Sequence, residues 1–223
     1  MDTENFDDFL IFVEKELDPA TTDLEHLADA NRKHIQKLVY TNLVDRFDAM
    51  VDEAILGNFR EEFLLNEALK SLSQPISESA LVRLLMEAAN IQAALDNRLQ
   101  DSLRNSILRE RHSKKLSTLF QVFQPEEDCW NKPRVNIADG SILGQIKPQQ
   151  HNTPYSICGY ADWLYSRRNS MVHGAGTNRF LENDRQQIIK LFKCTPASTF
   201  RIKLSSISNA ATFYQAVINI LRG

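Results

Sequence analysis

Three residues near the end of one predicted helix have the types and spacing needed for acid–base chemistry on a phosphodiester. The segment 163–174 reads WLYSRRNSMVHG, so Arg168 and Asn169 stand five and four residues before His173. A histidine exchanges protons near neutral pH, and a planar guanidinium stabilises the charge of a phosphorane. RNA brings its own nucleophile, the 2′-OH. A His/Arg pair could therefore cleave RNA without a metal ion.

The predicted helix places Arg168 inside an apolar stripe. At about 100° per residue, Arg168 falls about 40° from Leu164, and Met171 falls about 20° from it on the other side. A guanidinium in such a stripe must reach water, a carboxylate or a ligand, because an unpaired buried charge is costly. The alternatives are that Arg168 snorkels or pairs with an acid of another helix, and that His173 is only a favourable cation at a helix C-terminus.

The pattern Arg168-Asn169-x-x-x-His173-Gly174 resembles the signature of the HEPN superfamily. Its members are compact helical bundles with an Arg-x4–6-His motif on a late helix, often with Asn after the Arg and Val-His-Gly at the end. The resemblance implies a metal-independent endoribonuclease that needs no cofactor, of the toxin or anti-phage defence type. It carries the family's Arg over to Arg168 and its His to His173, with Asn169 in the polar position. Arg167 also satisfies the spacing, as Arg-x5-His, and is a candidate RNA contact.

The same resemblance implies a homodimer in which two copies of the motif face each other. On a straight helix Arg168 and His173 lie about 140° apart, so one copy does not bring them together without distortion. A toxin-type enzyme also implies an antitoxin or inhibitor protein as a partner besides RNA. The alternative function is a non-catalytic HEPN-like module that binds RNA, a nucleotide or a protein, because the superfamily includes inactive members.

A second group of charges lies in the segment 104–115, RNSILRERHSKK, which holds five Lys/Arg against one Glu. We interpret Arg109, Arg111, Lys114 and Lys115 as candidate RNA-binding residues, because such contacts add sequence-independent affinity. The alternative is that the segment is a solvated helix end, which is what such a run of charges more commonly indicates. The same alternative applies to His112. Three acids that share a helix face, Asp45, Asp48 and Asp52, are likewise expected to be solvated, although they could pair with Arg168.

The elements that must position these residues are helices. Only 7 Gly and 7 Pro occur among 223 residues, which disfavours a turn-rich β fold. Leu43, Phe47, Met50 and Ala54 recur at helical spacing, and a helix over 3–17 is expected to end at Pro19. A stripe from Leu81 to Leu103 predicts one long helix. We expect one HEPN-like all-α domain over 1–223, with a long Pro-containing loop or insertion at 124–154 and the motif helix at 155–174.

Charge distribution, cysteine spacing and hydrophobicity limit the kinds of partner and the cellular compartment that we expect. Residues 1–60 hold 14 Asp/Glu and 6 Lys/Arg, and residues 61–223 hold 15 Asp/Glu and 20 Lys/Arg. The net charge of −3 is therefore the sum of an acidic N-terminal part and a basic remainder of the chain. Such an asymmetry permits an anionic partner without demanding one. The three cysteines form no C-x-x-C pair, no cluster has metal-ligand spacing, and no stretch has the length of a membrane span or signal sequence. We therefore expect a cytoplasmic protein without metal or membrane partner.

Overall fold

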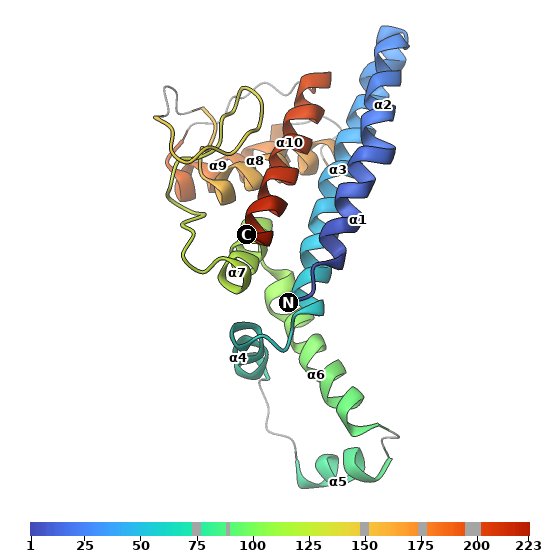
Figure 1. The fold of residues 1–223 in the computed structure, drawn as a ribbon, viewed down its shortest axis with the longest axis vertical. Coiled ribbons are helices and arrows are strands. Elements are labelled where there is room, and N and C mark those ends of the chain that lie inside the picture. Colours follow the sequence, from blue (N-terminus) through green and yellow to red (C-terminus); the bar gives the residue numbers. More distant parts are fainter. Residues whose placement is uncertain (73–76, 88–89, 148–151, 174–177, 195–201) are drawn as a thin grey trace.

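The computed structural model describes residues 1–72, 77–87, 90–147, 152–173, 178–194 and 202–223 (Figure 1). Across these ranges the regular elements are helices, and the β-type pairing is a single antiparallel bridge between Val135 and Ile142. The prediction of an all-α protein is confirmed. The helices are α1 (Glu4–Phe12), α2 (Asp18–Asp23), α3 (Asp29–Gly57), α4 (Glu62–Ser71), α5 (Glu78–Glu87), α6 (Ile91–Asn105), α7 (His112–Phe123), α8 (Ile157–His173), α9 (Asn178–Phe192) and α10 (Leu204–Arg222).

The core forms where α3 packs against α1, α7, α8 and α10. The apolar stripe predicted on α3 is buried throughout, as the helical spacing required. At its centre Phe47 stacks on Tyr214 of α10 with ring centroids 3.9 Å apart, and Phe9 of α1 meets Phe47 edge-on at 5.4 Å. These contacts fix α3 as the support on which the later helices lie.

The N-terminal helical stretch is longer than predicted. The chain does not stop at Pro19 but passes through a π-helical turn, Val13–Leu17, into α2, where Pro19 occupies the first turn. Proline is tolerated there because the N–H that it lacks would have no partner within that turn. Pro19 therefore marks a change of helical register and not an end.

The long helix predicted from the stripe of leucines is divided into α5 and α6. Asn90 begins α6 by accepting a hydrogen bond from the backbone N–H of Ala93 at 3.1 Å, which is the usual role of an N-cap residue. In Figure 1 the helices α4, α5 and α6 form an arm that projects from the rest of the molecule. We call residues 62–105 the arm.

The stretch between α7 and α8 runs as turns across one side of the molecule. Its bridge brings Val135 beside Ile142, and the turn between them contains Gly140 in the left-handed region, with φ of +81°. A Cβ atom at this position would lie 1.9 Å from the backbone oxygen of Asn209, so only glycine fits. Asn209 in turn donates to the carbonyl of Ala138 at 2.8 Å, which ties the stretch to α10.

Candidate functional site

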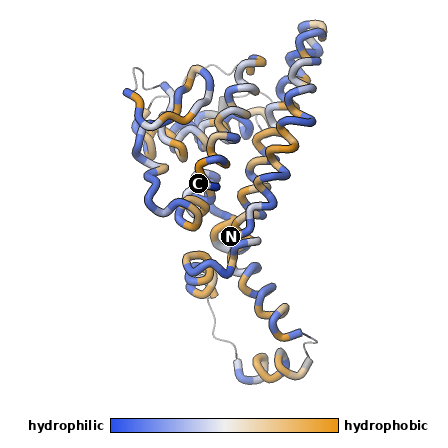
Figure 2. The backbone as a smooth tube through the Cα atoms, in the orientation of Figure 1, coloured by the Kyte–Doolittle hydropathy of each residue, from blue (hydrophilic) through white to orange (hydrophobic). Residues whose placement is uncertain are grey.

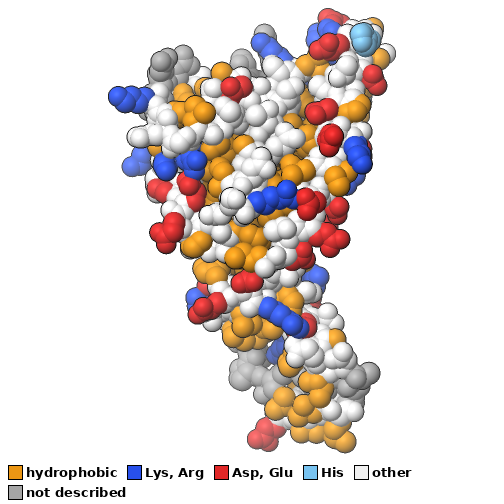
Figure 3. All heavy atoms as spheres, viewed as in Figure 1, with side chains coloured by type: hydrophobic (Ala, Val, Ile, Leu, Met, Phe, Trp, Pro, Cys, Tyr) orange, Lys and Arg blue, Asp and Glu red, His pale blue; other side chains and the backbone are white. Residues whose placement is uncertain are grey.

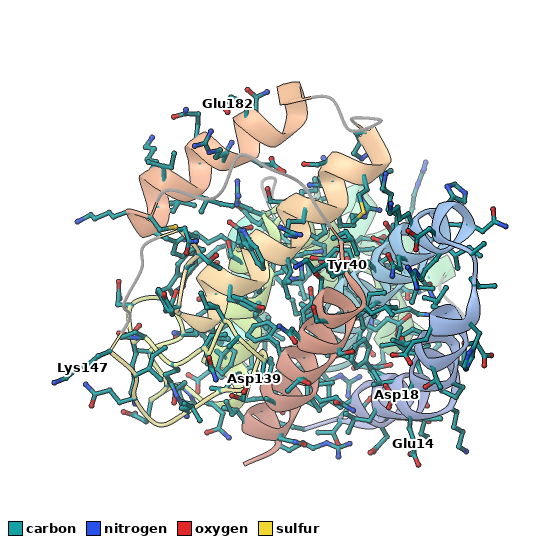
Figure 4. The ribbon with its side chains drawn as sticks, turned by 90° about the horizontal axis from the view of Figure 1, so that it is seen from above. Glu14, Asp18, Tyr40, Asp139, Lys147 and Glu182 are labelled. Carbon is teal, nitrogen blue, oxygen red and sulfur yellow. The ribbon has the colours of Figure 1, made fainter. Side chains whose placement is uncertain are left out.

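The motif helix α8 lies between α3, α7 and α9, and seen from above it passes close to α10 (Figure 4). Its apolar stripe, which includes Ile157, Ala161 and Leu164, is buried in the core. The hydroxyl of Tyr40 on α3 donates to the carbonyl of Leu164 at 3.0 Å, in the interior where Figure 4 labels Tyr40. This bond and the packed stripe fix the rotation of α8, and hence the direction of every side chain on it.

Arg168 is held by a carboxylate of α3. Its Nε donates to Oδ1 of Asp45 at 2.5 Å and its Nη1 donates to Oδ1 of Asn169 at 3.0 Å, with 19% of the Arg168 side chain exposed. Two of the five N–H groups of the guanidinium are thereby used. The side chain of Asp45 is 41% exposed, so it is solvated as expected and also pairs with Arg168, which was the alternative. Packing required it, because the buried stripe turns Arg168 toward α3.

Asn169 and His173 face a different helix. Asn169 and Ser166 are polar neighbours of Asp184 on α9, and their hydrogen-bonding groups act to lower the pKa of its carboxyl. Burial raises the pKa of Asp184, and the positive charges of Arg111 and His173 offset part of that increase. His173 itself is exposed at the end of α8. Arg168 thus contacts α3 while His173 lies near α9, and Gly174, the last residue of the motif, lies outside the described residues.

Arg167, the alternative motif arginine, packs on the far side of α8. Its guanidinium lies 4.6 Å from the ring centroid of Trp163, a cation–π contact. It also lies near the hydroxyl of Tyr40, on which it acts as a hydrogen-bonding and charged neighbour. The contacts of Arg167 thus include aromatic side chains, and Arg168 is bound by a carboxylate as well as lying 5.7 Å from the ring centroid of Tyr165.

A polar cavity of about 440 Å³ opens between α3, α7, α8 and α9. Charged and hydrogen-bonding side chains make up most of its wall, and we call it the polar cavity. Its lining residues are Asp48, Asp52, Leu108, Arg109, Glu110, Arg111, His112, Lys115, Asp162, Tyr165, Ser166, Asn169 and Asp184. One residue of the motif, Asn169, thus shares a cavity with three Lys/Arg residues of the basic segment, which are Arg109, Arg111 and Lys115.

The first pair in the polar cavity is His112 with Asp48. Nδ1 of His112 lies 2.6 Å from Oδ1 of Asp48, and the imidazole stacks on the ring of Tyr165 with centroids 4.9 Å apart and planes within 1° of parallel. Burial alone would raise the pKa of Asp48, but the hydrogen bonds and charges of His112 and Lys115 outweigh it and lower the pKa to about 2. Asp48 is therefore ionised, and Nδ1 of His112 carries the shared hydrogen.

Two cations, Lys115 and Arg111, complete the wall with three ion pairs. Nζ of Lys115 lies 2.7 Å from a carboxylate oxygen of Asp48 and 2.7 Å from one of Asp52. On the other side, Nε of Arg111 donates to Oδ2 of Asp162 at 2.5 Å. Burial raises the pKa of Asp162, and the charge and hydrogen bond of Arg111 counter it in part. The two cations therefore neutralise carboxylates inside the protein.

The basic segment 104–115 is thus divided by the fold. Arg111 and Lys115 point inward, while Arg109 and Lys114 are exposed, the first donating to Asn105 and the second lying 5.1 Å from the ring centroid of Trp130. Helical geometry explains the division, since 111 and 115 share a face from which 114 is rotated away. RNA contact stays a prediction for all four residues, but they do not form one continuous band.

Four residues of the cavity were missed or misread in the sequence. His112 and Asp48 were expected to be solvated and are not. Nothing in the sequence around Asp162 or Asp184 indicated that either residue lines a site. The spacing in the sequence could have indicated this pairing. Asp48 and Asp52 stand four residues apart, and His112 and Lys115 stand three apart, so each pair lies on one face of its helix. Two such helices packed side by side can bring the acidic pair against the basic pair. Recognising it required knowing that α3 and α7 are neighbours.

The described part of the chain contains no group of three or more His, Cys, Asp or Glu residues that could hold a metal ion. None of the helices that the structure describes is long and apolar enough to cross a membrane. Comparisons with models of protein families, with curated proteins and with solved structures found no match. The site is therefore interpreted from its own geometry.

Proposed function

We propose that this protein is a metal-independent endoribonuclease of the toxin or defence type, which cleaves single-stranded RNA by attack of the 2′-OH on the adjacent phosphate. His173 exchanges the proton, and Arg168 stabilises the charge that develops on the phosphorane. Asn169 positions Arg168. The products are a 2′,3′-cyclic phosphate and a 5′-hydroxyl.

One observation carries the proposal: Arg168 is oriented by Asp45 and Asn169, while His173 is exposed at the end of the same helix. A guanidinium held on two sides loses little freedom when it binds a phosphate with its remaining N–H groups. An exposed imidazole is accessible to a ribose. These are the properties that each role requires.

The proposal requires a second copy of the chain. Within one copy Arg168 is directed to α3 and His173 lies near α9, so a symmetric dimer would supply the Arg of one chain and the His of the other. The exposed end of α8 would then lie at the two-fold axis. Light scattering at micromolar concentration is expected to give twice the 25.5 kDa mass of the chain.

The test is cleavage of single-stranded RNA in the presence of EDTA. Arg168→Ala and His173→Ala are each expected to lower the rate by at least about 100-fold, because each removes a group that acts in the transition state. Asp45→Asn keeps the size of the side chain but loosens Arg168, and should lower kcat by a smaller factor. The matched control is His26→Ala, which changes an exposed histidine distant in sequence from the motif.

Three results separate the possibilities. Cleavage that survives both motif substitutions but stops in EDTA contradicts the mechanism. Loss of activity in Arg167→Ala with retention in Arg168→Ala reassigns the arginine. RNA binding without cleavage by the unmodified chain identifies the non-catalytic binding module.

A further inference from the structure

The polar cavity has an excess of negative charge that its own cations do not balance. Five carboxylates line it against three Lys/Arg cations, and two of these cations, Arg111 and Lys115, form ion pairs with aspartates of the wall. Lys115 is shared by Asp48 and Asp52, and Arg111 binds Asp162 while also acting on Asp184. Each cation thus serves two carboxylates. A buried carboxylate without a full partner is costly, so the wall favours an additional positive charge.

Two buried atoms of this wall also lack hydrogen-bond partners among the described residues. They are Nε2 of His112 and Oδ1 of Asp162, on side chains that are 0% and 1% exposed. Buried polar atoms are nearly always paired, so two orphans lining one cavity point to a ligand. Oδ1 of Asp162 is a carboxylate oxygen that can accept a hydrogen bond, and Nε2 of His112 is the second orphan atom of the same wall.

We propose that the polar cavity binds an organic cation with several N–H donors, a guanidinium or a primary ammonium group. The cation donates to Oδ1 of Asp162 in the cavity that His112 also lines, and its charge balances the excess carboxylates. A guanidinium fits best, because its planar fork presents donors in two directions. This proposal stands independently of the ribonuclease proposal, since none of the atoms that carry it belongs to Arg168 or His173.

The arrangement of the wall selects against a bare metal ion. The carboxylates are distributed around the cavity, and the described residues bring no three His, Cys, Asp or Glu side chains together as a metal site. Arg111 and Lys115 stand between the carboxylates and would repel a compact divalent charge. A volume of about 440 Å³ is also far larger than one ion needs and admits an alkyl chain behind a guanidinium.

The experiment titrates the full chain with three probes and measures heat of binding together with the change in Tm. Agmatine offers a guanidinium on an alkyl chain, the peptide Gly-Arg-Gly offers the same group as a protein side chain, and choline is a cation without N–H donors. Agmatine is expected to bind saturably and raise Tm, and choline is not. Binding of the peptide alone would mean that the cation belongs to a partner protein, and binding of agmatine that a free small molecule suffices.

Asp162→Asn tests the contact itself, with Asp23→Asn as the matched control on an exposed surface. Loss of a charged hydrogen bond should weaken agmatine binding at least about tenfold, with the control unchanged. Should Asp162→Asn fail to fold, histidine ring NMR of the unmodified chain replaces it, and agmatine must shift the His112 signals while His26 and His34 stay fixed. No saturable binding of agmatine or peptide, equal binding of choline, or unmoved His112 signals would overturn the proposal. None of these readouts depends on RNA cleavage.

Discussion

The polar cavity and the arm reverse the usual distribution of side chains in opposite ways. Around the cavity, the ionisable residues His112, Lys115 and Asp162 are buried. On the arm, large apolar side chains are exposed, and Met86 has 80% of its surface accessible. Figure 2 shows hydrophobic residues along α5, and Figure 3 shows them gathered on the surface at the lower end of the molecule.

The two regions differ in how their side chains affect the free energy of unfolding. Buried charges cost desolvation energy that their pairing returns only in part, so an all-apolar wall at the cavity would be at least as stable. Exposed apolar side chains, in contrast, cost the isolated chain little and become favourable only when something covers them. The charged groups of the cavity are therefore paired in part within the protein, whereas the exposed apolar side chains of the arm are in contact with solvent.

The largest effect is expected from Lys115→Met. This change keeps the length of the side chain but leaves Asp48 and Asp52 without their shared cation, and breaking a buried ion pair costs about 3–5 kcal/mol of unfolding free energy. Urea unfolding measures it. Lys114→Met, one position away on the exposed face of α7, is the control and should change stability by less than about 1 kcal/mol. Equal effects of the two substitutions would contradict the view that Lys115 forms a buried ion pair while Lys114 is exposed.

Asp48→Asn should show a smaller effect with a defined dependence on pH. The folded-state pKa of Asp48 is lowered from 3.8 to about 2, so its ionised form stabilises the fold above about pH 4, and this contribution is lost as the pH falls toward 2. The pH-dependent part amounts to about 2 kcal/mol. Urea midpoints of the native chain and the variant should therefore converge on acidification. Asp8→Asn, on the exposed side of α1, should run parallel to the native chain at every pH; a gap for Asp48→Asn that widens in acid would contradict the ion pairing.

The smallest effect is expected on the arm. Leu85→Ser and Met86→Ser alter side chains that are 53% and 80% exposed, and each should change the unfolding free energy by no more than about 0.5 kcal/mol. Leu103→Ala, in the fully buried part of α6, is the matched contrast and should cost about 2–5 kcal/mol. If light scattering finds a dimer that these serine substitutions dissociate, the arm and not α8 forms the interface.

Much of the secondary structure was predictable because helix signals are local. The stripe of α3 and the position of α8 follow from spacing alone. Helix ends were less predictable: Pro19 was absorbed by a change of helical register, and Asn90 began a new helix within an uninterrupted stripe of leucines. Both outcomes depend on which backbone groups found partners, and side-chain hydropathy does not report that.

The sequence by itself determined that the chain is helical, that Arg168, Asn169 and His173 share one helix, and that Arg168 must meet a counter-charge or a ligand. Only the tertiary structure decided that the counter-charge is Asp45, that Asn169 joins Asp184, and that His112 and Lys115 close over Asp48 and Asp52. The physical reason is that helical periodicity fixes which side chains share a face, whereas the packing of distant helices fixes what each face meets.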